Sequence, residues 1–323
     1  MFNNSVILLT GGTGSFGHAF TNIILKKYKP KKLIIFSRDE MKQWNMSKLY
    51  KDSRLRFFIG DVRDRDRLYR AFNGVDYVIH AAAAKIVPTA EYNPFEYVKT
   101  NVNGAMNVID AALDNNVKKV IALSTDKASS PVNLYGATKL VSDKLFVDGN
   151  SSYSTKTIFS VVRYGNVVGS RGSVIPFFRE IRDTGKIPIT DKRMTRFFIT
   201  VENAVELVLF AVKDSIGGEI YIKKIPSVKI TELAKAIAPL AKQEIVGIRP
   251  GEKIHEQMIA KEEAPYSFEY KDYYKILPYI NKWYQDKKRI KNGKKVEEDF
   301  TYSSNNNKEW ISGKELTTWL KKN

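Results

Sequence analysis

Short apolar runs alternate with amphipathic stretches through the first half of the chain. The runs have the length and composition of strands, and the stretches between them have the apolar spacing of helices. Strands that alternate with helices predict a parallel sheet, and runs without strict polar alternation are typical of strands buried on both faces. We therefore predict an α/β fold with a doubly wound parallel sheet. The predicted strands are residues 6–10, 32–37, 55–60, 77–80, 119–124 and 160–164, and the predicted helices are residues 16–27, 40–50, 64–72, 95–115 and 134–147.

The pattern changes after about residue 169, where the segments become shorter and prolines interrupt them. We predict a first domain at residues 1–168 and a smaller C-terminal domain at residues 169–323, with a return to the sheet near residues 219–222. Residues 265–298 are polar and aromatic, and their pattern favours no particular element.

The composition narrows the possible chemistry. The chain has 323 residues, no cysteine and three histidines, which lie far apart in the sequence. Disulfides and thiolate chemistry are thereby excluded, and we expect no metal site. No apolar run approaches the roughly 18 residues that a membrane span needs. We therefore expect a cytoplasmic protein with no membrane partner.

The net charge of +18 raises the question of a nucleic-acid partner. The basic residues are spread along the chain, and their densest run, at residues 287–295, lies in a polar stretch. A basic cleft for an anionic small molecule needs only a few of these charges. We expect no nucleic-acid partner.

A glycine-rich turn, TGGTGSFG at residues 10–17, lies between a predicted strand and a predicted helix. Glycines permit the tight turn, and the helix N-terminus favours the negative charge of a pyrophosphate. Strand, turn and helix together predict a Rossmann-type dinucleotide site in the first domain. The residues expected to contact the cofactor here are Gly11, Thr13, Gly14, Ser15 and Phe16.

The end of the second predicted strand bears on the choice between NADP and NAD. An acidic residue there binds a free ribose 2′-hydroxyl, whereas an arginine accommodates a 2′-phosphate. Ser37 and Arg38 come first and Lys42 follows, so we favour NADP. Asp39 is the counter-argument, because it is either an acidic ribose ligand or a helix N-cap.

The next two strand ends supply further expected cofactor contacts, since ligands of open α/β sheets bind at the carboxyl ends of the strands. The small side chains there also suit close packing of a helix on a strand. The residues are Asp61, Val62, Ala81 and Ala82.

Tyr135 and Lys139 share one face of a predicted helix, because they are separated by one helical turn. A lysine ammonium beside a phenol favours the phenolate and lowers the pKa of the tyrosine. A phenolate can take the proton of a substrate alcohol while a hydride leaves its carbon. The spacing predicts alcohol oxidation by a nicotinamide cofactor.

The fifth predicted strand ends in Ser124-Thr125-Asp126-Lys127. The hydroxyl of Ser124 or Thr125 is enough to orient a substrate alcohol. Asp126 and Lys127 add an acid and a base, which indicates a second reaction beside the redox step. The same pair also fits a surface ion pair with a helix cap.

These motifs resemble the extended short-chain dehydrogenase/reductases that act on nucleotide sugars, and among them the inverting UDP-N-acetylglucosamine 4,6-dehydratases, which start pseudaminic acid synthesis. Related membrane-anchored dehydratases have methionine in place of Tyr135, and many other 4,6-dehydratases have glutamate in place of Lys127. The resemblance runs from residue 6 to about residue 310 and rests on STDKA (124–128), NLYGATK (133–139), RYGNVVGSRG (163–172), RMTRF (193–197), IRPGEK (248–253) and YSS (302–304).

The resemblance implies a mechanism. Tyr135, helped by Lys139, takes the O4 proton while the C4 hydride passes to NADP⁺. Lys127 removes the C5 proton, for which it must be neutral, so we expect its pKa to be lowered. Asp126 protonates the departing 6-hydroxyl, the hydride returns to C6, and C5 is reprotonated on the opposite face. The implied product is a 4-keto-6-deoxy-L-arabino sugar nucleotide, and the implied partners are UDP-N-acetylglucosamine and further copies of the chain in a homo-oligomer.

Polar residues of the same motifs are expected to hold the nucleotide sugar, mainly in the C-terminal domain. Val167 is expected beside the cofactor, and Lys85 beside both ligands, although Ile86 stands where the family has a histidine. The arginines suit phosphate geometry but also fit surface salt bridges. The expected substrate contacts are Lys85, Thr100, Asn166, Arg171, Thr190, Arg193, Arg196 and Arg249.

Two other functions stay open. A UDP-hexose 4-epimerase would use the same tyrosine and cofactor, but it needs no acid–base pair at C5 and C6. A non-catalytic NADP-binding protein would not need Tyr135 and Lys139, which are both present.

Overall fold

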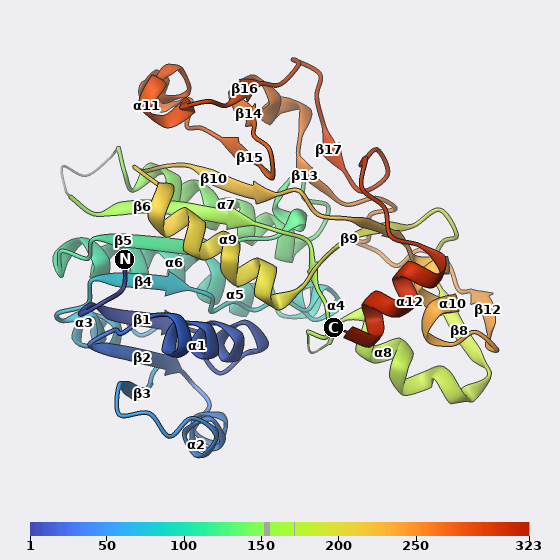
Figure 1. Ribbon diagram of the computed structural model, residues 1–323, viewed down its shortest axis with the longest axis horizontal. Coiled ribbons are helices and arrows are strands. Elements are labelled where there is room, and N and C mark those ends of the chain that lie inside the picture. The colour runs from blue at the N-terminus through green and yellow to red at the C-terminus, as the bar shows by residue number, and fades with distance from the viewer. Residues whose placement is uncertain (152–155, 171, 323) are drawn as a thin grey trace.

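A ten-stranded sheet forms the centre of the computed structural model, which describes residues 1–151, 156–170 and 172–322 (Figure 1). The strand order is β16-β14-β15-β10-β6-β5-β4-β1-β2-β3, and the strands from β10 to β3 run parallel. Their apolar side chains are buried on both faces, as expected for runs without alternation. These parallel strands are β1 (Val6–Thr10), β2 (Lys32–Ser37), β3 (Leu55–Ile59), β4 (Tyr77–His80), β5 (Lys119–Leu123), β6 (Ile158–Arg163) and β10 (Ile220–Lys223).

Helices cover both faces of the sheet, which confirms the doubly wound fold. One face carries α3 (Arg65–Phe72), α6 (Gly104–Asp114) and α7 (Leu134–Asp148), which contact one another in that order. The other face carries α1 (Ser15–Lys27) and α9 (Val201–Asp214), which lie side by side in Figure 1.

The predicted helix at residues 95–115 is interrupted. It consists of α5 (Pro94–Tyr97), the π-helical turn η1 (Val98–Asn103) and α6, and the helix α4 (Val87–Tyr92) before it was not predicted. Apolar periodicity does not reveal a one-residue widening of the helix. The widened turn places Asn101 so that its side chain accepts from Ala84 N and donates to Ala84 O, both at 2.9 Å. The π turn therefore holds the segment that follows β4.

The sheet continues beyond β10, which returns where the pattern predicted. Residues 265–298, to which the pattern assigned no element, supply antiparallel strands there: β15 (Tyr273–Ile276), β14 (Ser267–Glu269) and β16 (Lys294–Lys295). The pattern hides them because Lys275, in the middle of β15, is buried. Its ammonium pairs with Asp214 at 2.8 Å, so a charged residue occupies a position that would ordinarily be apolar.

A smaller region with its own apolar core is built from the segments between and after β6 and β10. Residues after 169 therefore contribute to both regions, since α9, β10 and β14–β16 belong to the sheet. Among the described residues, no helix is long and apolar enough to cross a membrane. The smaller region contains β7 (Asn166–Val167), α8 (Val174–Ile181), β8 (Lys186–Ile189), β9 (Thr195–Ile199), β11 (Ser227–Lys229), α10 (Ile230–Ile237), β12 (Lys242–Ile245) and α12 (Gly313–Lys322), and β13 (Gln257–Ile259) pairs with β17 (Tyr302–Ser303) beside it.

Candidate active site

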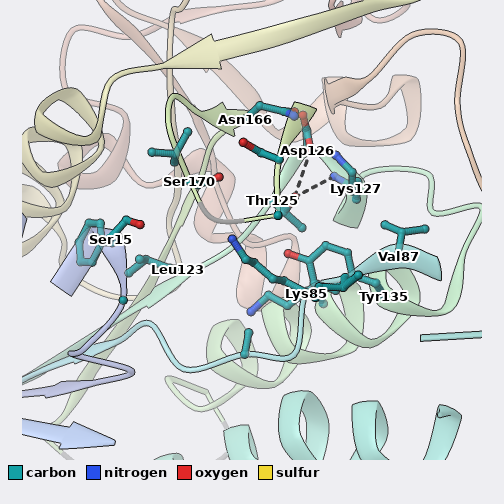
Figure 2. A pocket seen from close by; sticks show the side chains of 18 of the residues that line it. Ser15, Lys85, Val87, Leu123, Thr125, Asp126, Lys127, Tyr135, Asn166 and Ser170 are labelled. Atoms are coloured by element: carbon teal, nitrogen blue, oxygen red, sulfur yellow. Dashed lines mark hydrogen bonds and ion pairs between the residues drawn. The ribbon is translucent and has the colours of Figure 1, made fainter. Parts of the chain in front are cut away.

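A cleft of about 870 Å³ lies at the carboxyl ends of the parallel strands, between the sheet and the smaller region. Open α/β sheets bind their ligands at this edge. Every residue that we expected to contact the cofactor lines the cleft. Figure 2 shows Ser15 across the pocket from Lys127 and Tyr135, so the glycine turn and the acid–base residues face one space.

The glycine turn is fixed by close backbone packing. Gly11 has a φ of +66°, in the left-handed region that favours glycine. A Cβ on Gly17 would lie 2.0 Å from the carbonyl oxygen of Gly12, so only glycine lets α1 approach the turn this closely.

The first and fourth strand ends are tied together below this turn. The hydroxyl of Thr10 accepts hydrogen bonds from the amides of Ala81 and Ala82, both at 3.2 Å, and therefore donates to His80 Nδ1 at 2.9 Å. Burial, with a smaller effect of Lys139, lowers the pKa of His80 to about 3, so this imidazole is neutral.

Asp39 is the N-cap of α2 (Glu40–Leu49), which is the second of its two expected roles. Its carboxylate accepts from Lys42 N at 2.9 Å and pairs with Lys42 Nζ at 2.7 Å. The neighbouring Arg38 side chain is 65% exposed at the cleft, with a nitrogen 3.7 Å from Asp61 Oδ2. Both side chains line the cleft, and the acidic group of Asp39 is in addition engaged at the helix terminus.

Tyr135 and Lys139 lie in the first turns of α7, which begins because the side chain of Asn133 accepts from Gly136 N at 2.8 Å. Both side chains are buried. Burial raises the pKa of Tyr135 to about 12, although Lys127 and a hydrogen bond with Thr125 oppose the rise. The expected lowering of this pKa is wrong for the structure, because Tyr135 packs in an apolar cluster with Ala90.

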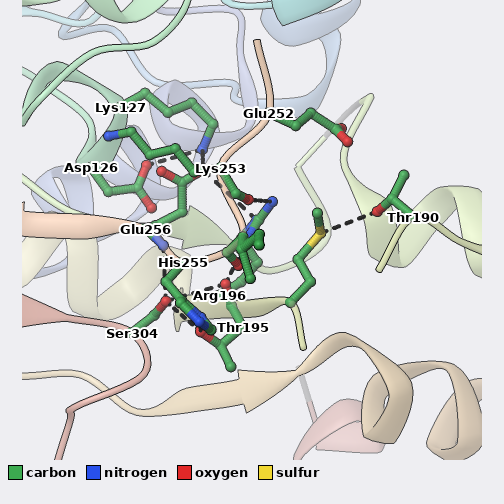
Figure 3. A network of polar contacts seen from close by, with 12 residues as sticks. Asp126, Lys127, Thr190, Thr195, Arg196, Glu252, Lys253, His255, Glu256 and Ser304 are labelled. Carbon is green, nitrogen blue, oxygen red and sulfur yellow. Dashed lines mark hydrogen bonds and ion pairs between the residues drawn. The ribbon is translucent and has the colours of Figure 1, made fainter. Parts of the chain in front are cut away.

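Asp126 and Lys127 lie in the 3₁₀ turn η2 (Asp126–Ala128), which is capped by Thr125. The Thr125 hydroxyl accepts from Lys127 N at 3.3 Å and donates to Asp126 Oδ1 at 3.1 Å (Figure 2). Lys127 Nζ lies 3.1 Å from Asp126 Oδ1 and 3.1 Å from Glu256 Oε1 (Figure 3). One ammonium is thus held between two carboxyl groups.

The pKa values of Asp126 and Lys127 are shifted by burial and by the neighbouring charges. Burial raises the pKa of Asp126, although Lys127 opposes the rise, so Asp126 keeps its proton to a higher pH than an ordinary aspartic acid does. Burial would lower the pKa of Lys127, but the carboxylates of Asp126 and Glu256 outweigh burial and raise it. The expected lowering of the Lys127 pKa is therefore wrong for the structure, and this lysine is an ammonium.

Glu256 is the residue of this group that the sequence did not reveal. It precedes β13, its side chain is buried, and its amide donates to Ser304 Oγ at 3.0 Å. The one available signal was an acidic residue near the 248–253 motif, and Glu252, inside that motif, gave the same signal.

Arg196 and Arg193 have partners within the protein. The Arg196 guanidinium donates to the carbonyls of Thr195, Lys253 and Ile254 at 2.7–3.0 Å, and its Nε lies 3.8 Å from Glu256 Oε1. These bonds fix the segment that carries Glu256. Arg193 lies outside the cleft lining and forms a two-pronged pair with Asp191 at 3.0 and 2.8 Å.

The other expected substrate residues lie at the cleft, apart from Arg171, which is outside the described residues. Asn166 Oδ1 is buried there and has no hydrogen-bond partner among the described residues. Arg249 pairs with Glu252, and the Thr190 hydroxyl donates to Met194 Sδ at 3.2 Å. The other two expected substrate residues at the cleft are Lys85, whose pKa is lowered by burial, and Thr100. In the described ranges, no group of three or more histidine, aspartate or glutamate side chains could hold a metal ion.

A parallel sheet with a glycine turn, a tyrosine–lysine pair and an adjacent acid–base group defines an extended short-chain dehydrogenase/reductase. The chain belongs to the family described as "Polysaccharide biosynthesis protein", whose sequence pattern matches residues 7–278. It is 56% identical over 324 residues to the UDP-N-acetylglucosamine 4,6-dehydratase (inverting) of Campylobacter jejuni subsp. jejuni serotype O:23/36 (strain 81-176), across 98% of this chain and 97% of that protein. This identity confirms the resemblance seen in the motifs.

Three further similarities bear on the fold and on the alternatives. A protein named UDP-glucose 4-epimerase, from Rickettsia conorii (strain ATCC VR-613 / Malish 7), is 44% identical across 85% of this chain and 84% of its own length. The X-ray structure of Pen from Bacillus thuringiensis is similar with a TM-score of 0.90 and 37% identity, covering 100% of this chain and 99% of that chain. The dTDP-glucose 4,6-dehydratase DesIV from Streptomyces venezuelae, solved with NAD and TYD bound, shares the fold with a TM-score of 0.71 and 24% identity over 77% of this chain and 86% of that chain.

Proposed function

We propose that the chain dehydrates UDP-N-acetylglucosamine across C4–C6 with inversion at C5. The product is UDP-2-acetamido-2,6-dideoxy-β-L-arabino-hex-4-ulose, and the reaction is the first step of pseudaminic acid biosynthesis. The observation that carries the proposal is the position of Asp126 and Lys127 in the same cleft as Tyr135 and the glycine turn. The relative that is 56% identical and bears the name of this activity supports it.

The cleft suits a nicotinamide cofactor, because the left-handed Gly11 and the N-terminus of α1 form a cradle for a pyrophosphate. Such a cofactor supplies a hydride acceptor for C4 and a hydride donor for C6. Tyr135 takes the O4 proton as a phenolate, a form that burial disfavours and that the positive charges of Lys127 and of Lys139, one turn further along the same helix, favour. Lys127 removes the C5 proton, and Asp126 donates its proton to the departing 6-hydroxyl.

We propose NADP as that cofactor. Arg38 is exposed at the cleft, where it can bind a 2′-phosphate. Asp39 caps α2 and is paired with Lys42, which argues against its use as a ligand of the ribose 2′-hydroxyl. We also propose that the cofactor contacts the other residues predicted for it, which lie in the glycine turn and at the strand ends.

For the nucleotide sugar we propose contacts with Lys85, Thr100, Asn166, Thr190 and Arg249. The unpartnered, buried Asn166 Oδ1 is the group with the clearest need of a ligand donor. The internal partners of Arg193 and Arg196 favour positioning roles for these two residues.

We also propose a homo-oligomer, because four large apolar side chains are exposed on the neighbouring segments α4–α7. Contact with a second copy of the chain would remove these side chains from water. Sedimentation velocity tests this proposal, and cell fractionation tests the predicted cytoplasmic location. The four are Tyr92, Phe95, Met106 and Val141.

Proton NMR of UDP-N-acetylglucosamine incubated with the protein and NADP in deuterated water tests the reaction. Dehydration gives a 6-methyl signal, and reprotonation from solvent places deuterium at C5, while the coupling constants of the product made in ordinary water give the configuration at C5. A C4 epimer without a 6-methyl signal would instead support an epimerase, the activity named for the rickettsial relative. The absence of both products would reject both reactions.

A further inference from the structure

Lys127 must lose a proton before it can act on C5. An ammonium has no lone pair, and the structure holds Lys127 as an ammonium between two carboxyl groups. The proposed dehydration therefore needs a group that accepts this proton within the closed cleft.

Asp126 lies as close to Lys127 as Glu256 does, but its role as the acid excludes it as the acceptor. The side chain of Asp126 is 1% exposed and lies close to a second carboxyl group, so two negative charges beside one ammonium are disfavoured. Asp126 also has to be protonated already, because it donates a proton to the leaving hydroxyl. The remaining ion pair is the one between Lys127 and Glu256.

Glu256 has the geometry of a proton acceptor. Its Oε1 lies 3.1 Å from Lys127 Nζ, and its Oε2 is buried with no hydrogen-bond partner among the described residues. Figure 3 shows the carboxyl group of Glu256 between Lys127 and Arg196. Arg196 Nε, at 3.8 Å, favours the carboxylate at rest, so the protonated form of Glu256 is short-lived.

We propose that Glu256 takes the proton from Lys127 and thereby prepares the base for the C5 proton. This role rests on the proposed function. The transfer leaves neutral Lys127 and protonated Glu256, with no change in the net charge of the group. Lys127 then takes the C5 proton, and Asp126 gives its proton to the 6-hydroxyl, which leaves as water.

The same three groups restore the starting state. After water has formed, Lys127 is again an ammonium, Asp126 is a carboxylate and Glu256 is protonated. The Glu256 proton passes through Lys127, whose Nζ lies 3.1 Å from each carboxyl group, to Asp126. One proton is gained from C5 and one is lost to water, so the group ends as it began.

The first test is the pH at which Lys127 becomes neutral, measured as its rate of acylation by acetic anhydride with peptide mass spectrometry. Without the Glu256 charge, Glu256→Gln should shift the Lys127 profile to lower pH by about one unit. The control is Glu263→Gln, which removes a partly buried carboxylate that pairs with Arg163 instead. An unshifted profile in Glu256→Gln would overturn the proposal.

The charged and titratable groups that face Lys127 and Glu256 are retained in both variants. They come from every element packed against the pair: Asp126 on η2, Tyr135 on α7, Arg196 on β9 and Lys253 before β13. A shift confined to Glu256→Gln therefore reports the lost carboxylate.

The second test is turnover. We expect Glu256→Gln to lower kcat about 100-fold, because Asp126 must then serve as counter-ion and acid at once, with KM unchanged. With a substrate deuterated at C5, Glu256→Gln should show a larger isotope effect on kcat than the wild-type protein does. Glu256→Asp, which keeps a carboxylate, should recover part of the rate. If kcat is unchanged in Glu256→Gln, or if Glu256→Gln and Glu256→Asp lower kcat equally, the carboxylate of Glu256 is not the acceptor.

The two proposals fail in different ways. Wild-type protein that forms no 6-methyl product rejects the proposed dehydration, and the role of Glu256 with it, although the acylation profile still reports the Lys127–Glu256 pair. Wild-type dehydration together with unchanged Glu256→Gln turnover rejects the role of Glu256 alone.

Discussion

The two walls of the cleft are built in different ways. The cofactor wall consists of successive strand ends of one sheet, and each of its turns is complete within a few residues. The acid–base wall joins η2, which follows β5, to Arg196 and Glu256 from segments far along the chain. Local motifs therefore describe the first wall well, whereas the second exists only once the smaller region has packed against the sheet.

The largest expected effect separates the walls by function. Lys127→Ala removes the base of the acid–base wall, so dehydration should fall on the order of 1000-fold. Cofactor affinity, measured by fluorescence titration, should stay unchanged because the cofactor wall is intact. Full turnover in this variant would show that the base lies elsewhere, and weakened cofactor binding would show that the walls are not independent.

A change in the cofactor wall should instead weaken cofactor binding. Gly17→Ala places a Cβ 2.0 Å from Gly12 O, so α1 must move away from the turn. We expect a loss of about 1–3 kcal/mol in the free energy of unfolding, together with weaker cofactor binding. Urea denaturation with and without NADP measures both, and the control is Gly74→Ala, where no atom lies within 4 Å of the new Cβ and the positive φ alone adds strain.

Cofactor choice is a finer test of the same wall. Arg38→Ala should weaken NADP binding about tenfold and leave NAD binding unchanged, because only NADP carries the 2′-phosphate. Isothermal titration with both cofactors measures the difference. Equal losses for both cofactors would mean that Arg38 contacts a group they share.

The smallest effect concerns pH. The pKa of His80 is lowered to about 3 in the folded protein, so the unfolded chain binds more protons between about pH 6.5 and pH 3, and the stability falls as the pH falls. The titration of His80 alone should lower the free energy of unfolding by about 0.8 kcal/mol between pH 7.5 and pH 6. His80→Asn, which keeps an acceptor for Thr10, should flatten that part of the profile in urea denaturation. If the free energy of unfolding falls with pH equally steeply in the variant, His80 is not the group responsible.

Several elements could be predicted from the sequence because their signals are local. The parallel strands and the glycine turn have the apolar runs and spacing that such elements require. The antiparallel strand β15 could not be predicted, since Lys275 is buried there by a pair with Asp214. In the same way, the family resemblance implied Lys127 as a neutral base but did not reveal Glu256, whose proximity depends on how segments distant in the sequence meet.

The return of the chain at β10 also has a consequence for folding. Strand β6 pairs with β10 on the side away from β5, and the smaller region begins to form between them in the sequence. Until β10 has been synthesised, the open edge of β6 presents unpaired amides and carbonyls, which other chains can bind. Pairings this distant in sequence form slowly, because the loop between them must close first. During synthesis, aggregation is therefore most probable before β10 covers that edge.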